Sequence, residues 1–238
     1  MDFEFLFDPF SLGKTRLPTR IVMPGMQRGR CEDGHLMPEM IDYYARRVRA
    51  GAGLIVGEGC CVEHWSASGN PNLPRIAPDT IGTWARCADG VHEAGGAMLL
   101  QLSHPGAIRT NAQFVLENDK PSLSASGLYT PDKANGRAAT RAELDEIRDT
   151  FAEAAVLAIQ AGMDGVELHA CHGFFLDEFL WADTNRREDE YGGATIAERA
   201  TYPASVLAAM RDAMGPDAIL SIRISQWKEV DYHAQNVT

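Results

Sequence analysis

The histidines His169 and His172 stand three residues apart, at the end of the apolar run 165–169. Such a run predicts a strand, and a neutral imidazole can donate a hydrogen bond to a substrate oxygen or bind a metal ion. The competing metal site would join the two histidines with Glu167 or Asp177. No third histidine or cysteine has suitable spacing for it, so we predict an active-site loop without a metal.

Two more polar side chains lie at the ends of apolar runs. The carboxamide of Gln101 can donate and accept hydrogen bonds at once, although a strand-end residue bonded to backbone would look the same. Arg223 is always charged and lies on an otherwise apolar run, so it needs a negative partner if it is buried. Glu167 is the neighbouring carboxylate that could pair with it. Both residues are therefore candidates for a binding site.

Apolar runs and helix patterns alternate strictly along the chain. Since the repeated units predict an α/β fold, the alternatives are a doubly wound sheet and a (β/α)8 TIM barrel. The candidate site residues lie at strand ends, where barrel enzymes build active sites, and the loops 103–140 and 170–193 are long. These two features favour the barrel. The expected strands are 20–24, 53–58, 97–102, 165–169 and 218–224, and the expected helices are 39–50, 80–94, 141–161 and 195–214.

The number of units is too small for a closed barrel. Eight strand–helix units need ~250 residues with short loops, whereas the 238 residues supply only five units and two long loops. The sequence therefore predicts one incomplete barrel domain over residues 1–238, with strands six to eight absent.

Composition excludes several classes of partner. Asp and Glu number 33 against 22 Lys and Arg, and a net charge of -11 disfavours nucleic acids and anionic membranes. The N-terminus is acidic where a secretory signal would be basic, and no apolar run is long enough to span a membrane. Five cysteines without a C-x-x-C pair predict reduced thiols. We expect a cytoplasmic protein that acts on a small molecule.

The chain resembles the N-terminal part of the proteins of the Old Yellow Enzyme family. Members of this family are FMN-dependent NAD(P)H:flavin oxidoreductases. The block 169–193 carries the resemblance most specifically. Shorter segments that also match are 7–10 (FDPF), 20–26 (RIVMPGM), 53–59 (GLIVGEG), 101–106 (QLSHPG) and 223–228 (RISQWK). The resemblance implies FMN at the carboxyl end of the barrel. It also implies hydride transfer from NAD(P)H through the flavin to an activated alkene such as an α,β-unsaturated carbonyl.

Particular residues acquire roles from this resemblance. It implies that His169 and His172 bind the carbonyl oxygen of the substrate and are the catalytic pair. Gln101 would bind the flavin pyrimidine edge, and Arg223 would stabilise negative charge on the reduced ring. The other cofactor-binding residues that it implies are Pro24, Gly25, Met26, Gln27 and Gly59.

The sequence departs from the family pattern at Gln27 and Phe174. The family often has Thr or Cys at the first position. At the second it commonly has a tyrosine, whose hydroxyl protonates the product. Phenylalanine has no proton to give, so either water or another residue protonates the product, or the physiological reaction differs from ordinary enone reduction. Tyr129, in the long loop 103–140 after the third expected strand, is one candidate donor.

Two other functions compete with an FMN-dependent reductase. The first is a truncated, inactive remnant, because the phosphate of FMN binds beyond the fifth strand in the family. Its open sheet edges would favour association of copies into a homo-oligomer. The second is a metal-dependent barrel hydrolase that uses the histidine pair.

Overall fold

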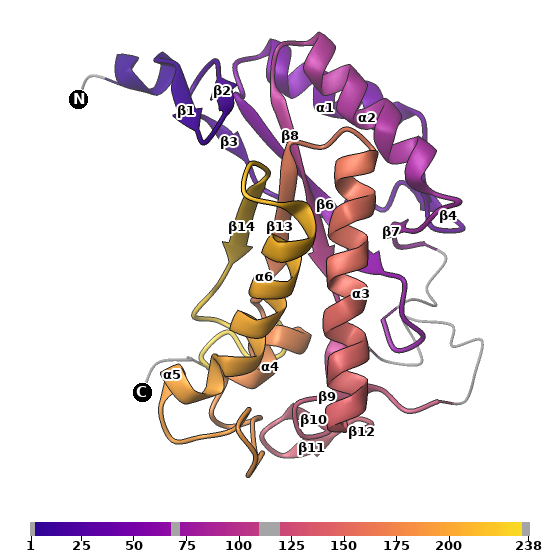
Figure 1. Cartoon of the computed structure of the whole chain (residues 1–238), viewed down its shortest axis with the longest axis vertical. Helices are drawn as coiled ribbons and strands as arrows, with labels where there is room; N and C mark the ends of the chain where they lie inside the picture. The colour runs from indigo at the N-terminus through magenta and orange to yellow at the C-terminus, as the bar shows by residue number, and fades with distance from the viewer. Residues whose placement is uncertain (1–2, 68–71, 110–119, 235–238) are drawn as a thin grey trace.

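The centre of the computed structural model, which describes residues 3–67, 72–109 and 120–234, is a parallel sheet. Its strands follow chain order, β3–β6–β8–β13–β14 (Figure 1). The short strand β7 also pairs with the last residues of β6. The order never reverses, as it would in a doubly wound sheet, so the predicted incomplete barrel is confirmed. The strands are β3 (Val22–Met23), β6 (Leu54–Val62), β7 (Arg75–Ile76), β8 (Ala97–Ser103), β13 (Gly165–His169) and β14 (Ile219–Arg223).

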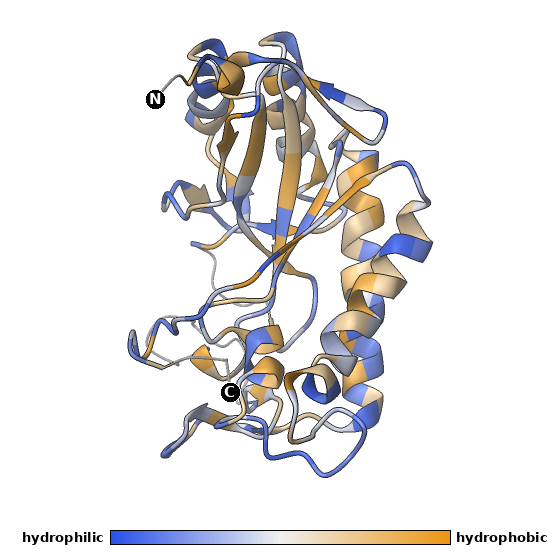
Figure 2. Cartoon of the chain, turned by 90° about the vertical axis from the view of Figure 1, so that its left-hand side faces the viewer, coloured by the Kyte–Doolittle hydropathy of each residue, from blue (hydrophilic) through white to orange (hydrophobic). Residues whose placement is uncertain are grey.

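Four helices cover the outer face of the sheet: α1 (Glu39–Arg49), α2 (Ile81–Glu93), α3 (Arg141–Gln160) and α6 (Thr201–Met214). Between them and the strands lies the main apolar core, in which Trp84 and Phe151 are fully buried. Figure 2 shows the hydrophobic colour concentrated on the central strands, and the helices beside them carry both colours. Burial of this face stabilises the sheet against the helices.

The predicted helix 195–214 is in fact two helices. A short α5 (Ile196–Arg199) begins with a capping box of Thr195 and Glu198, and α6 starts after Ala200. Pro203 lies in the first turn of α6, where its missing N–H leaves no hydrogen bond for the carbonyl of Arg199. The interruption therefore has a local cause.

The inner face of the sheet has a small apolar floor. It consists of Leu17, Leu54, Val56, Ala97, Leu99 and Ile219, with Leu12 packed against them. Leu12 and Leu17 belong to the antiparallel hairpin of β1 (Phe10–Leu12) and β2 (Thr15–Leu17). The hairpin thus fills the end of the half-barrel where the strands begin, and polar side chains follow further along the strands.

One extra residue interrupts the regular alternation of β6. Val56 pairs with Leu99, but the next pairing joins Gly59 to Gln101, so two residues of β6 oppose one of β8. This is a β-bulge. Its second residue, Glu58, turns toward α1, where its backbone N–H donates to the Tyr44 hydroxyl, and its carboxylate accepts from the backbone N–H of Arg28. Gly59 consequently faces the interior.

The two long loops pack against each other beyond the carboxyl ends of the strands. Glu178, in α4 (Phe175–Leu180), accepts a 2.6 Å hydrogen bond from the backbone N–H of Ala107. Arg187 donates to the carbonyl oxygens of Ala125 and Ala139. The smaller elements are η1 (Glu4–Phe7), β4 (Cys31–Glu32), β5 (His35–Leu36), η2 (Gly106–Ile108), β9 (Leu123–Ser124), β10 (Leu128–Thr130), β11 (Lys133–Ala134) and β12 (Arg137–Ala138).

The outermost strands, β3 and β14, carry exposed apolar side chains. The exposed fractions are 47% for Val22, 40% for Ile222 and 68% for Ile224, which directly follows β14. Open sheet edges of this kind favour association. Among the described residues, no helix has both the length and the apolar character that crossing a membrane requires.

Replacing Thr140 with alanine should lower the free energy of unfolding by about 1 kcal/mol. The Thr140 hydroxyl accepts from the backbone N–H of Glu143, whose carboxylate accepts in return from the Thr140 N–H, so α3 begins with the predicted capping box. Thermal unfolding followed by circular dichroism would measure the loss. Thr150→Ala, in the middle of the same helix, is the matched control and should cost nothing, since alanine has the higher helix propensity. Equal effects would contradict the capping role.

Candidate active site

A layer of polar side chains lies on the inner face of the sheet. Gln101 on β8 and Ser221 on β14 are both register partners of Glu167 on β13. Gln101 Nε2 donates to Glu167 Oε1 at 2.7 Å, and Ser221 Oγ donates to Glu167 Oε2 at 3.0 Å. Both carboxylate oxygens therefore accept a hydrogen bond from a neighbouring strand, and Glu167 links β13 to β8 and β14.

His169 is the next inward residue of β13 after Glu167. Its Nδ1 lies 3.1 Å from Gln101 Oε1, and its ring meets that of Phe174 edge to face at a centroid distance of 4.6 Å. Burial, assisted by the nearby charge of Arg223, lowers the pKa of His169 to about 3. The imidazole is therefore neutral at physiological pH, as the proposed hydrogen-bonding role requires.

His172 follows in the loop after β13 and has a left-handed backbone, with φ of +65°. Its ring stacks on Trp227 at a centroid distance of 3.9 Å and lies 5.8 Å from the ring of His169. The Ser225 hydroxyl oxygen accepts from the His172 backbone N–H at 3.0 Å and lies 2.9 Å from Nδ1. Burial lowers the pKa of His172 as well. The structure thus brings the two histidines together.

Arg223 reaches across the interior of the half-barrel. One guanidinium nitrogen donates a long hydrogen bond, 3.5 Å, to the carbonyl oxygen of Gly25 after β3. Within the described part of the chain, Arg223 forms no ion pair, because Glu167 bonds to Gln101 and Ser221 instead. The alternative of an Arg223–Glu167 salt bridge is therefore wrong.

The segment after β3 borders the same interior. Gln27 Nε2 donates to the Gly59 carbonyl oxygen at 2.6 Å. A Cβ atom on Gly25 would lie 2.8 Å from Gln101 Nε2, and one on Gly59 would lie 3.2 Å from Gln101 Oε1. Both glycines therefore leave room around the Gln101 amide. Pro24 and Met26 lie in this segment and are exposed.

A buried ion pair holds the loop after β14 against α4, next to His172. Lys228 Nζ donates to Asp177 Oδ2 at 2.6 Å, and both side chains are fully buried. The same Asp177 oxygen accepts from the backbone N–H of Gly173, and the backbone N–H of Glu229 donates to the His172 carbonyl. The pair thus ties the loop after β14 to α4 and to His172. The sequence alone gave no indication of this contact.

Cys171 lies between the two histidines and packs in the interior. Its side chain is fully buried, and burial raises the pKa of its thiol to about 12. Asn185 and Arg187 support the loop, since Asn185 Nδ2 donates to the carbonyl oxygens of Phe179 and Tyr191. All five cysteines are free and buried, consistent with the predicted reduced thiols.

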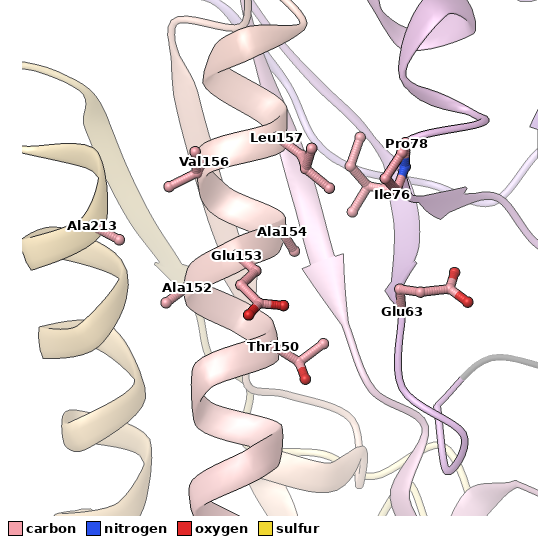
Figure 3. Close-up of a pocket in the computed structure, with 10 residues that line it drawn as sticks. All are labelled: Glu63, Ile76, Pro78, Thr150, Ala152, Glu153, Ala154, Val156, Leu157 and Ala213. Carbon is pink, nitrogen blue, oxygen red and sulfur yellow. The ribbon is translucent and has the colours of Figure 1, made fainter.

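No group of three or more His, Cys, Asp or Glu side chains that could hold a metal ion occurs in the described ranges. A groove of about 480 Å³ lies along α3, and its lining includes Ile76, Ala154 and Leu157 (Figure 3). Ile76 and Ala154 belong to the core on the outer face of the sheet. The groove is therefore separate from the interior that contains Gln101 and His169.

Comparison with known proteins agrees with this geometry. Residues 5–237 match the model of the NADH:flavin oxidoreductase / NADH oxidase family. The chain belongs to this family. Solved Old Yellow Enzymes share its fold: the structure from Pichia sp. superposes with a TM-score of 0.86 at 27% identity, covering 98% of this chain and 64% of that one.

Two further relatives indicate the range of the family. The chain is 34% identical to 12-oxophytodienoate reductase 7 of Oryza sativa subsp. japonica over 232 residues, which is 92% of this chain and 58% of the relative. Morphinone reductase in complex with tetrahydroNAD superposes with a TM-score of 0.83 at 30% identity, covering 93% of this chain and 64% of that chain. The chain thus spans about 60% of the length of its Old Yellow Enzyme relatives.

Proposed function

We propose that this protein is an FMN-dependent oxidoreductase that passes hydride from NAD(P)H to an activated alkene such as an α,β-unsaturated carbonyl. The observation that carries the proposal is the convergence of Gln101, Arg223 and His169 on the inner face of a half-barrel of this family. Because the chain spans only about 60% of its relatives, activity has to be tested on this chain itself.

The side chains of the interior fit the polar edge of a flavin ring. That edge carries alternating carbonyl and N–H groups, which the Gln101 amide can match as both donor and acceptor. Gly25 and Gly59 leave the amide uncovered, since a Cβ on either would lie within 3.2 Å of it. Arg223, which has no carboxylate partner among the described residues, provides positive charge. A flat, partly anionic ligand is the complement of such a surface.

When bound, FMN would supply the hydride chemistry by accepting hydride from NAD(P)H and giving it to the alkene. The chain supplies orientation and charge. Arg223 would stabilise negative charge next to Gly25. The hydrogen bond from Gln27 Nε2 to the carbonyl oxygen of Gly59 holds the segment after β3 against β6, beside the proposed ligand site.

The histidine pair would hold the substrate carbonyl. The two neutral rings lie 5.8 Å apart at the end of β13, a separation that allows both to approach one small oxygen. A hydrogen bond to that oxygen draws electron density from the alkene and favours addition at the far carbon. His172 is held for this role by its stack on Trp227.

Replacing Arg223 with methionine should weaken FMN binding about 10- to 100-fold. Hydrogen bonds to charged groups contribute about 1.5–3 kcal/mol, and each factor of ten in affinity is about 1.4 kcal/mol. Quenching of flavin fluorescence on titration of the protein into FMN would measure the dissociation constants. Arg49→Met is the matched control, because Arg49 pairs with Asp42 on the exposed face of α1.

Two results would contradict the proposal. If the unaltered chain leaves flavin fluorescence unchanged, the alternative of an inactive remnant replaces it. If Arg223→Met and Arg49→Met bind FMN equally well, the inner face is not where the flavin binds.

A further inference from the structure

The Glu167 carboxylate accepts both of the side-chain hydrogen bonds that it makes with neighbouring strands. Glu167 accepts from Gln101 Nε2 at 2.7 Å and from Ser221 Oγ at 3.0 Å. An ionised carboxylate can only accept hydrogen bonds. The NH2 group of Gln101 must therefore face Glu167, which turns the amide oxygen of Gln101 toward His169.

This orientation determines where His169 carries its proton. Its Nδ1 lies 3.1 Å from Gln101 Oε1, and an amide oxygen can only accept, so Nδ1 must be the protonated nitrogen. Because the ring is neutral, Nε2 keeps a lone pair. Cys171 Sγ lies 3.6 Å from Nε2 and 3.8 Å from Nδ1, so this weak thiol donor does not distinguish the two nitrogens, and the assignment rests on the Gln101 contact.

We propose that Glu167 is a positioning residue that acts through Gln101 to hold His169 in the tautomer protonated on Nδ1. The chain of bonds runs from His169 to Gln101 and ends on Glu167, whose second oxygen is occupied by Ser221. Reversing the Gln101 amide would place its oxygen against the carboxylate. The negative charge of Glu167 therefore fixes the orientation of the Gln101 amide, and with it the direction of the hydrogen bond to His169.

The tautomer has a consequence for ligand binding, and this part rests on the proposed function. With Nε2 unprotonated, His169 in the flavin-free chain accepts a hydrogen bond from a ligand hydroxyl. Donation from Nε2 to a substrate carbonyl requires the Gln101 amide to leave Nδ1. A flavin edge offers this amide new partners, so occupation of the cofactor site would release His169 for its role in the reaction.

Nitrogen-15 NMR of the histidine rings in the flavin-free protein tests the assignment, because protonated and unprotonated ring nitrogens have well-separated shifts. The His169 signals are identified by their loss in His169→Asn. We expect Nδ1 to be protonated in the unaltered chain. In Glu167→Gln, where residue 167 can donate as well as accept, a mixture of both tautomers is expected. Ser221→Ala, which removes only the bond to Oε2, should retain the original tautomer.

Three results would overturn the inference: protonation on Nε2 in the unaltered chain, an unchanged tautomer in Glu167→Gln, or a mixture in Ser221→Ala. Should Glu167→Gln fail to fold, Gln101→Leu tests the same link, and an unchanged tautomer there counts equally against it. Failure of FMN to bind would instead remove the proposed function and leave the tautomer assignment standing. The two ideas therefore fail separately.

Discussion

Replacing Lys228 with methionine should lower the free energy of unfolding by about 3–5 kcal/mol, because it leaves the Asp177 carboxylate buried without its cation. Both side chains are fully buried, and Lys228 Nζ lies 2.6 Å from Asp177 Oδ2. Chemical denaturation followed by tryptophan fluorescence would measure the loss. Trp227 stacks on His172 beside this pair, so its fluorescence also reports loosening of the loop.

The exposed ion pair of Lys14 and Asp217 is the control for this prediction. Its N–O distance is also 2.6 Å, but the two side chains are 76% and 58% exposed. Water screens such a pair, so Lys14→Met should cost no more than about 1 kcal/mol. A double substitution, Lys228→Met with Asp177→Leu, should recover part of the loss because it removes both charges. A Lys228→Met protein as stable as Lys14→Met would refute the structural role of the pair.

Replacing Phe174 with tyrosine should raise the turnover of a simple enone by the FMN-loaded protein about 10²-fold, at the low end for a positioned general acid. The Phe174 ring lies 4.6 Å from that of His169, so a hydroxyl on it would enter the site. A tyrosine hydroxyl is protonated at neutral pH and can supply the proton that phenylalanine lacks. Steady-state oxidation of NADPH with 2-cyclohexenone would measure the effect.

Two variants separate proton donation from packing at this position. Phe174→Leu keeps an apolar side chain without a hydroxyl, and it should not raise turnover. Tyr129→Phe tests the other candidate donor, in β10, and should slow the reaction only if Tyr129 gives the proton. An unchanged rate in Phe174→Tyr would mean that protonation does not limit turnover in this protein.

The main elements were predictable because their signals are local. The five strands, the first three helices and the Thr140–Glu143 capping box occur where periodicity and capping chemistry predicted them, whereas the predicted helix 195–214 is divided into α5 and α6. The convergence of Gln101, His169 and Arg223 also followed from the sequence, since parallel strands bring their carboxyl ends to one edge. Their roles toward flavin and substrate remain predictions.

The sequence could not reveal features that depend on long-range packing. Lys228 and Asp177 are 51 positions apart, and only the docking of the last loop against α4 makes them partners. Glu167 carried a usable signal: it lies two residues before His169 on one strand, so both face the same side. Its binding to Gln101 and Ser221, in preference to Arg223, depended on the register of three strands.

The bulge in β6 decides which chemical group borders the interior that contains Gln101 and Arg223. An uninterrupted strand would alternate Val56 inward, Gly57 outward and Glu58 inward, and would set a second carboxylate beside that of Glu167. The extra residue turns this acid away, so that its carboxylate accepts from the backbone N–H of Arg28, and gives its place to Gly59. Shortening β6 by one position would thus add a second acid to a lining that already contains Glu167, and it would offset the positive charge that Arg223 presents to an anionic ligand.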